Sequence, residues 1–249
     1  MPKFFVEEGP GEPGAVIRVT GETAHHIVNV LRHRRGDRVM FCDGRLNDFC
    51  AALLCVEKQK NGAAAAVFEI LETKKCGYEP PAFVRLCQSL IKWDCFEYAV
   101  TKAVECGASE IAPVLAARGG VSADDAAKRL ERLRRLARQA AEQSMRGIIP
   151  KILPPAGIAE SIADTAAGFF GCHAESRGFA QALSRAGPAA AGGGFRIWIG
   201  PEGGFTADEK ELLKSGGALP VRLGNSVLRS ETAAVAAISQ LLCCLEGAQ

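Results

Sequence analysis

From residue 83 to residue 246, short apolar runs alternate with longer segments of helical periodicity. The apolar runs are typical of β-strands and span residues 83–90, 110–116, 168–176, 195–200 and 219–224. The helical segments span residues 94–107, 124–147 and 230–246. Alternating strands and helices predict an α/β domain with a mostly parallel sheet. Ligands of such sheets bind beyond the carboxyl ends of the strands, so a functional site is expected in the loops that follow them.

Capping signals mark where several helices are expected to begin. Asp94 and Glu97 are placed to cap the helix of residues 94–107, and Thr206 and Glu209 form a T-x-x-E capping box. A short helix near the N-terminus, over residues 21–32, is expected to be capped by Thr23.

The first 75 residues follow a different pattern. Short apolar or alternating runs, separated by Gly, Asp and Asn, predict strands over residues 15–20, 37–44, 48–59 and 63–72. Closely spaced strands with one short helix predict a small β-barrel. Residues 74–83 contain Gly77, Pro80 and Pro81 and are a plausible linker. We therefore expect two domains, residues 1–75 and residues 76–249.

Composition is that of an ordinary globular protein, with 48% apolar and 23% charged residues among 249. The net charge is only +2, so any attraction to nucleic acid has to come from a local cluster of basic residues. No apolar run approaches the roughly 18 residues of a membrane-spanning helix, and the N-terminus resembles no signal peptide. A cytoplasmic protein that does not enter membranes is expected.

Ten cysteines are present, but no two of them form a C-x-x-C pair. Structural zinc sites need paired ligands at short spacing, and disulfide frameworks belong to small secreted chains. We therefore expect the cysteines to be small buried hydrophobic residues, and we expect no metal.

The apolar run of residues 195–200 ends abruptly in Gly-Pro-Glu-Gly-Gly. Gly200, Gly203 and Gly204 can adopt positive φ and let a ligand approach the backbone, while Pro201 stiffens the turn. Such a turn suits a flat polar group, and the absence of a nearby lysine argues against a triphosphate. A tight connection between a strand and a helix is the alternative explanation.

A second polar loop follows the run of residues 219–224. It carries Asn225, Ser226 and Arg229, and Ser230 and Glu231 follow at the expected start of the last helix. Ser230 is expected to cap this helix, and Glu231 suits its first turn. Two such loops at the ends of neighbouring strands favour a ligand site over coincidence.

Basic residues gather in two places. Between residues 126 and 151, eight Lys or Arg residues stand against only Glu131 and Glu142, and residues 32–38 read Arg-His-Arg-Arg-Gly-Asp-Arg. A solvated helix face explains the first cluster without any function. Two clusters in two domains favour a long polyanion, and RNA fits.

Taken together, these segments resemble the SPOUT-class methyltransferases, and specifically the small-subunit ribosomal RNA uracil-N3-methyltransferase family. The resemblance rests on the segments HHIVNVLRHRRGD, DCFEYAVTKAVECGASEIAPV, RLARQAAEQSMR, IGPEGGFTADE and LGNSVLRSETAA. It implies an N-terminal PUA-like β-barrel that binds RNA and a C-terminal α/β domain whose chain ends in a trefoil knot. It also implies a homodimer that acts on small-subunit ribosomal RNA or the assembled small subunit, without a metal.

The resemblance implies that S-adenosylmethionine binds in the knot, held mainly by loop backbone. The residues at the matching positions are Ile199, Gly200, Pro201, Glu202, Gly203, Gly204, Leu223, Gly224, Asn225, Val227, Leu228 and Arg229. The residues expected to contact RNA are Lys3, Arg32, Arg34, Arg35, Arg132, Arg135 and Arg146. Lys3 stands where family members commonly carry arginine, which would weaken a bidentate contact.

Methylation of uracil N3 requires loss of the imide proton from a base that is unpaired or flipped out. Arg229 is the candidate for stabilising the developing oxyanion, and Glu202 or Glu231 for accepting the proton. Three other functions stay open: an RNA-binding assembly factor without catalysis, a methyltransferase of this class acting on another RNA, and a phosphosugar or nucleotide enzyme.

Overall fold

The computed structural model describes residues 1–7, 11–58, 64–162, 167–174, 177–186 and 194–247. The chain divides into two compact units. The first contains Met1–Glu79 together with Ala141–Ile149, and the second contains Pro80–Ala140 together with Pro150–Gln249. Residues 141–149, which the sequence assigns to the second domain, therefore pack with the first unit.

The first unit is built on a five-stranded mixed sheet in the order β1-β3-β4-β5-β2. Its strands are β1 (Lys3–Phe5), β2 (Val16–Val19), β3 (Arg38–Cys42), β4 (Asn47–Lys58) and β5 (Ala64–Lys75). The β1–β3 pair is parallel and the other pairs are antiparallel. Register shifts in the long β4–β5 hairpin mark irregularities of the kind that bend a sheet. Four of these strands were predicted, whereas β1 was not.

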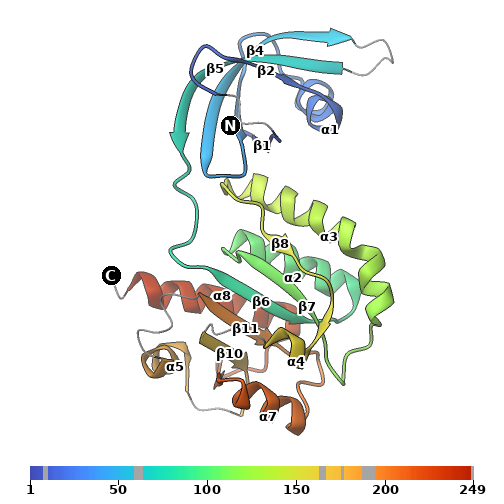
Figure 1. Ribbon diagram of the computed structural model, residues 1–249, viewed down its shortest axis with the longest axis vertical. Coiled ribbons are helices and arrows are strands. Elements are labelled where there is room, and N and C mark those ends of the chain that lie inside the picture. Colours follow the sequence, from blue (N-terminus) through green and yellow to red (C-terminus); the bar gives the residue numbers. More distant parts are fainter. Residues whose placement is uncertain (8–10, 59–63, 163–166, 175–176, 187–193, 248–249) are drawn as a thin grey trace. The chain divides into compact units, whose positions relative to one another are not determined.

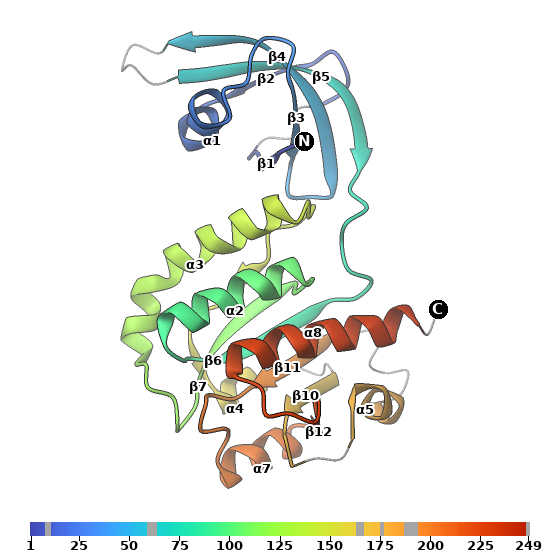
Figure 2. The same cartoon turned by 180° about the vertical axis from the view of Figure 1, so that it is seen from behind.

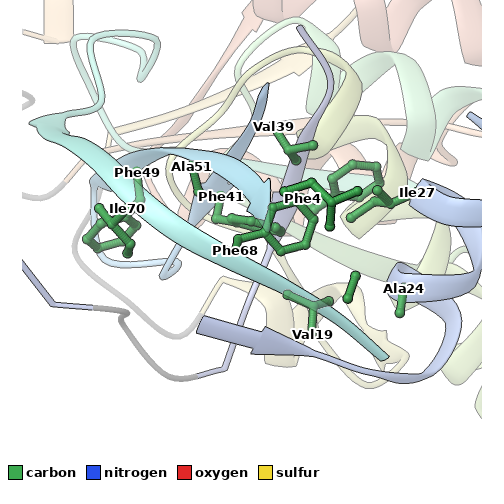
Figure 3. Packing of buried hydrophobic residues seen from close by; sticks show 12 residues of the cluster. Phe4, Val19, Ala24, Ile27, Val39, Phe41, Phe49, Ala51, Phe68 and Ile70 are labelled. Atoms are coloured by element: carbon green, nitrogen blue, oxygen red, sulfur yellow. The ribbon is translucent and has the colours of Figure 1, made fainter. Parts of the chain in front are cut away.

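A helical segment covers the sheet of the first unit. It consists of α1 (Gly21–His25) and a π-helical turn, η1 (His26–Val30). Thr20, and not Thr23, is the N-cap residue, so the predicted cap was wrong. Ile27 of η1 is fully buried in the core of this unit, which is shown in Figure 3. In the same core, the rings of Phe41 and Phe68 meet edge to face, with their centres 4.9 Å apart.

The second unit contains a seven-stranded parallel sheet (Figure 1), in the order β12-β10-β11-β6-β7-β8, with β9 also paired to β7. The strands are β6 (Val84–Ser89), β7 (Glu110–Leu115), β8 (Lys151–Ile152), β9 (Ala156–Gly157), β10 (Ala167–Gly171), β11 (Phe195–Ile199) and β12 (Ala218–Val221). All five residues of β11 are buried, as expected for a strand of a parallel sheet covered on both faces. The predicted parallel α/β sheet is confirmed.

The helices are α2 (Trp93–Glu105), α3 (Ala123–Gln143), α4 (Ile158–Ser161), α5 (Phe179–Ala186), α7 (Ala207–Ser215) and α8 (Ser230–Glu246). In Figures 1 and 2, α2 and α8 lie side by side, and α8 also contacts β6 and β11. The chain thus leaves β12 at the edge of the sheet and returns to its centre to form α8. A trefoil knot requires a return of this kind. Helices α4 and α5 and strands β8 and β9 were not predicted.

The predicted cap of α2 was wrong. The helix begins at Trp93, and its N-cap residue is Lys92, whose side chain makes no capping hydrogen bond. Glu97 points to another helix instead and accepts a hydrogen bond of 2.7 Å from Arg132. A tertiary ion pair has therefore replaced the local capping interaction that the sequence pattern suggested.

Only Cys42 and Cys87 are buried, so the expectation that the cysteines are uniformly buried was wrong. Burial raises the pKa of each of these two thiols to about 12, so both stay protonated. Cys55 and Cys243 are exposed.

Among the described residues, no helix combines the length and the hydropathy that spanning a membrane requires.

Candidate functional site

Four parallel strands of the second unit end at the same edge of the sheet. Strands β6, β11, β10 and β12 are neighbours and run in the same direction. The chain leaves this edge through loops that include residues 172–174, 200–206 and 222–229. Both polar loops therefore start at the same edge of the sheet, which is where the sequence predicts a ligand site.

The first loop is a tight turn built on glycine. The N–H of Gly204 donates to the carbonyl of Pro201 at 2.8 Å, and Gly204 has a φ of +66°. Gly200 and Gly203 do not have positive φ, so the expectation was right for only one of the three glycines. Gly200 is instead favoured by the close packing of the turn, because an added Cβ would lie 3.2 Å from the N of Phe205.

Two side chains fix this loop from outside. Arg118 donates from Nη1 to the carbonyl of Gly203 at 2.6 Å. Glu209 accepts from the N–H groups of Thr206 and Ala117, each at 2.7 Å. The Thr206–Glu209 capping box is confirmed. Its glutamate also joins the turn to the loop after β7, which the sequence did not indicate.

The second loop is tied to the first by buried side chains. Ser230 donates from Oγ to the carbonyl of Gly200 at 2.7 Å, and Gln88 donates from Nε2 to Ser230 Oγ at 2.8 Å. Gln240 of α8 donates to the carbonyl of Leu223 at 2.7 Å. Ser230 was predicted to cap α8, but Arg229 is the N-cap residue and makes no side-chain capping bond. The serine hydroxyl is used to join the two loops.

Gln88 was missed by the sequence reasoning, although a signal was present. It is the one amide in the mostly apolar run of residues 83–90, and it is fully buried. Within the described part of the chain, its Oε1 and the hydroxyl of Ser89 have no hydrogen-bond partner. Burying a polar group without a hydrogen-bond partner lowers the stability of the fold. We therefore expect Gln88 to position Ser230 and not to stabilise the fold.

The two loops line an open cavity with a volume of about 170 Å³. Nine of the twelve residues expected to bind the cofactor line it: Ile199, Gly200, Pro201, Glu202, Gly204, Leu223, Gly224, Val227 and Leu228. Gly203 and Asn225 do not line it, and Arg229 lines an adjoining cavity together with Glu231. Residues of the β10 end also contribute, namely Gly171, Cys172 and His173, which the sequence did not indicate.

Replacing Gln88 with Leu is expected to weaken binding in this cavity about 10-fold while leaving the melting temperature nearly unchanged. The substitution removes the donor that fixes Ser230, but it also removes an unpaired buried oxygen, so the two effects on stability oppose each other. Calorimetric titration with S-adenosylmethionine and thermal unfolding measure the two quantities. Gln139→Leu, the same change at an exposed position of α3, is the control. Unchanged affinity in Gln88→Leu would contradict this positioning role.

The basic cluster of the first unit lies on an exposed and well-defined loop. Arg32, Arg34 and Arg35 are exposed, and Arg32 has a φ of +55° directly after η1. The loop is held by a hydrogen bond of 2.7 Å from the N–H of Arg34 to Asp37 Oδ2, and by one of 2.8 Å from the N–H of Gly36 to Leu53. Two hydrogen bonds therefore hold the loop backbone that carries these three arginines.

Lys3 and Arg146 are buried, which corrects the expectation that they contact RNA. The side chain of Lys3 is 0% exposed, and its Nζ lies 2.6 Å from Asp48 Oδ1. The side chain of Arg146 is 3% exposed and is paired with Glu79 at 2.7 Å. Both charges are used within the first unit, where Lys3 also donates to the carbonyl of Met145 at 3.0 Å.

Several basic side chains of α3 have partners in the second unit. Arg132 is paired with Glu97, and these hydrogen bonds hold the pKa of the Glu97 carboxyl below its usual value. The guanidinium of Arg129 lies 4.5 Å from the centre of the Trp93 ring. Arg135 is exposed. The local excess of positive charge is therefore smaller than the count of basic residues suggests.

The described part of the chain contains no group of three or more His, Cys, Asp or Glu residues that could hold a metal ion.

Comparison with known proteins decides the family. A model of the RNA methyltransferase domain matches residues 78–242, and a model of the RNA methyltransferase PUA domain matches residues 19–49. The chain belongs to this RNA methyltransferase family. The resemblance inferred from the sequence motifs is thereby confirmed.

Relatives of the chain match along most of their length. Ribosomal RNA small subunit methyltransferase E of Bacillus subtilis is 31% identical over 97% of this chain and 96% of that protein. The protein of the same name from Mycobacterium tuberculosis is 32% identical over 94% of this chain and 88% of its own length.

Solved structures share the fold of the whole chain. Ribosomal RNA small subunit methyltransferase E of Neisseria gonorrhoeae, bound to S-adenosyl methionine, is similar with a TM-score of 0.82 and 30% identity, covering 96% of this chain and 95% of that one. A protein of Legionella pneumophila assigned as a methyltransferase, solved with its cofactor, has a TM-score of 0.82 and 26% identity over 97% of this chain and 96% of that one. The fold class predicted from the sequence is confirmed.

Proposed function

We propose that the protein transfers a methyl group from S-adenosylmethionine to N3 of a uridine in small-subunit ribosomal RNA. The cavity between the two glycine-containing loops carries this proposal, because it is formed at the positions expected for the cofactor. The cofactor-bound relatives and the names of the curated relatives support it.

The wall of the cavity suits this cofactor. It is formed largely by glycine backbone and apolar side chains, and Glu202 is the only acidic or basic side chain other than His173 among the described residues that line it. Such a wall can hold a flat adenine and an aliphatic chain, and one carboxylate suits a cationic ligand. A phosphosugar would need cationic or N–H-rich anchoring, so this wall favours the methyltransferase over the phosphosugar alternative.

The cofactor supplies an electrophilic methyl group, and the protein supplies orientation and electrostatics. Arg229 is exposed at the start of α8 and can stabilise negative charge on a uracil carbonyl oxygen as the N3 proton leaves. Glu231 lines the same cavity as Arg229, which favours it over Glu202 as the proton acceptor. Glu202 lies by the cofactor cavity and is better placed to attract the cationic cofactor.

Two measurements test the proposed function. Calorimetric titration should show saturable binding of S-adenosylmethionine, and purified small ribosomal subunits or their RNA should accept a labelled methyl group. Mass spectrometry of the digested RNA should then find the label as N3-methyluridine. Binding without transfer to either substrate would favour an assembly factor, and label in another RNA would favour a different substrate.

For RNA binding, we propose that Arg32, Arg34 and Arg35 contact phosphates in the first unit and that Arg135 does so in the second. These four side chains are exposed, whereas Lys3 and Arg146 are buried. The partial match to an RNA methyltransferase PUA domain supports the role of the first unit.

Replacing both Arg34 and Arg35 with Gln should lower the affinity for ribosomal RNA and flatten its dependence on salt. Each lost phosphate contact reduces the slope of log K against log salt concentration by about 0.7 for single strands and about 0.9 for duplexes. Fluorescence anisotropy over a salt series measures this slope. Arg18→Gln, at another partly exposed arginine of the first unit, is the control. A loss of cofactor binding in the double variant would contradict the separation of the two sites.

A homodimer is also part of the proposal. The resemblance of the sequence motifs to the uracil-N3-methyltransferase family supports it, because that resemblance implies a homodimer. Sedimentation equilibrium tests the oligomeric state. A substrate that belongs to the ribosome favours work in the cytoplasm.

A further inference from the structure

A second cavity adjoins the cofactor cavity. It is open, with a volume of about 980 Å³ including its mouth. Three elements of the second unit form its wall: the start of α2, the end of the second loop and the start of α8. The lining residues are Asp94, Cys95, Tyr98, Val227, Leu228, Arg229, Glu231 and Thr232.

The two cavities share a wall. Val227 and Leu228 line both of them, whereas the glycine turn belongs only to the first cavity and α2 only to the second. A group bound in the second cavity is therefore next to whatever occupies the first. This adjacency is what a transfer between two ligands requires, since the reacting atoms have to come within about 3–3.5 Å.

The side chains of the second cavity match the Watson–Crick edge of uracil. That edge presents one N–H group at N3 between two carbonyl oxygens, so it needs an acceptor flanked by donors. Asp94 and Glu231 supply carboxylate acceptors, and the guanidinium of Arg229 supplies donors. Arg229 and Glu231 form no ion pair with any described residue, so both remain available to a ligand.

Tyr98 adds an aromatic surface to this wall. Tyr98 lies on α2 and is 50% exposed, and it lines the cavity together with the charged residues Asp94, Arg229 and Glu231. A half-exposed ring at the wall of an open cavity is suited to stacking on a base that has left its helix or loop, which is how proteins commonly hold unpaired RNA bases. No role in ligand binding was predicted from the sequence for Tyr98 or for Asp94, which was expected only to cap α2.

We propose that this second cavity receives the target base, with Tyr98 stacked on the uracil ring and Asp94 and Arg229 recognising its edge. The inference rests on the proposed function and adds the place and the recognition of the substrate base. It also gives a reason for selectivity. Cytosine has an unprotonated N3, so a carboxylate facing N3 would accept a hydrogen bond from N3 of uracil but would be repelled by the lone pair on N3 of cytosine.

Tyr98→Ala should lower kcat/KM for methylation of the ribosomal substrate about 10-fold through a higher KM for RNA. The Kd for S-adenosylmethionine should stay within about twofold of the wild-type value, because Tyr98 does not line the first cavity. Tyr98→Phe keeps the ring and should recover most of the loss. Tyr78→Ala removes the other tyrosine of the chain, which is 62% exposed and lies in the first unit, and should have no effect.

Asp94→Asn tests the recognition of the base edge. It should narrow the preference for uridine over cytidine, measured as the ratio of binding affinities for two RNAs that differ only at the target position. Asp208→Asn is the control, because Asp208 also lies in the first turn of a helix. A Tyr98→Ala enzyme as active as Tyr78→Ala, or an unchanged ratio in Asp94→Asn, would overturn the assignment.

Failure of the proposed function gives a different result. In that case the wild-type protein itself would not bind S-adenosylmethionine or would not methylate RNA, whatever residue stands at position 98. Equal losses of cofactor affinity and of activity in Tyr98→Ala would instead assign the second cavity to the cofactor and overturn this inference alone.

Discussion

Valine in place of Gly200 is expected to weaken the binding of S-adenosylmethionine by about 10- to 100-fold. A Cβ at this position would lie 3.2 Å from the N of Phe205 and 3.4 Å from the backbone of Gly204. Backbone atoms of a tight turn cannot move away cheaply, and overpacking of this kind costs about 1–3 kcal/mol, which is up to about 100-fold in affinity. The carbonyl of Gly200 also accepts from Ser230, so a shift of the first loop would disturb the second.

Calorimetric titration of the Gly200→Val variant measures this effect, and thermal unfolding shows whether the fold is retained. Gly120→Val is the matched control, because an added Cβ at Gly120 meets no atom within 4 Å and the residue lies outside both cavities. If Gly200→Val bound the cofactor as tightly as Gly120→Val, the glycine turn would not be the cofactor site.

Much of the fold of the second unit could be predicted because its strands are buried runs. β11 is buried at all five positions, and such a run has few alternatives to a central strand of a parallel sheet. β1 could not be predicted in the same way. Its three residues are too few for a periodic pattern, and it exists because Lys3–Phe5 pairs in parallel with β3, far along the chain.

Capping patterns were reliable only where the local bond had no tertiary competitor. Thr206 and Glu209 form the predicted capping box. Glu97 binds Arg132 and Ser230 binds the carbonyl of Gly200, so neither caps the helix that the sequence pattern assigned to it. A sequence motif shows which bond a side chain can make locally, whereas the folded chain offers a second partner that no local motif reveals.

The same limit applies to the site. The two loops could be predicted because glycine and polar residues at strand ends are visible in the sequence, and most of the expected residues line the cavity. Gln88 and Arg118 could not be assigned, because their roles depend on hydrogen bonds to Ser230 and Gly203, more than eighty positions away. The prediction that Lys3 and Arg146 contact RNA was wrong for a related reason. Both side chains are buried and form ion pairs within the first unit, which the sequence does not reveal.

Arg229→Ala is expected to lower kcat for RNA methylation by about 100- to 1000-fold, the effect typical of removing one donor to a developing oxyanion. The Kd for S-adenosylmethionine should change by less than about threefold, because Arg229 lines the second cavity and not the first. Single-turnover methylation of small ribosomal subunits at saturating cofactor measures the chemical step, and calorimetry measures cofactor binding.

The structure allows this result to be separated from a loss of fold. Arg229 is exposed and makes no capping hydrogen bond, so its removal should change the free energy of unfolding by no more than about 0.5 kcal/mol. Arg229→Lys keeps the charge but not the forked donors, so its kcat should lie between those of the wild type and Arg229→Ala. Arg134→Ala, at a half-exposed arginine of α3, is the control. A normal kcat with a raised Kd for the cofactor in Arg229→Ala would assign Arg229 to cofactor binding and not to the oxyanion. The choice of Glu231 as the proton acceptor would then lose its support, because it rests on the cavity that Glu231 shares with Arg229.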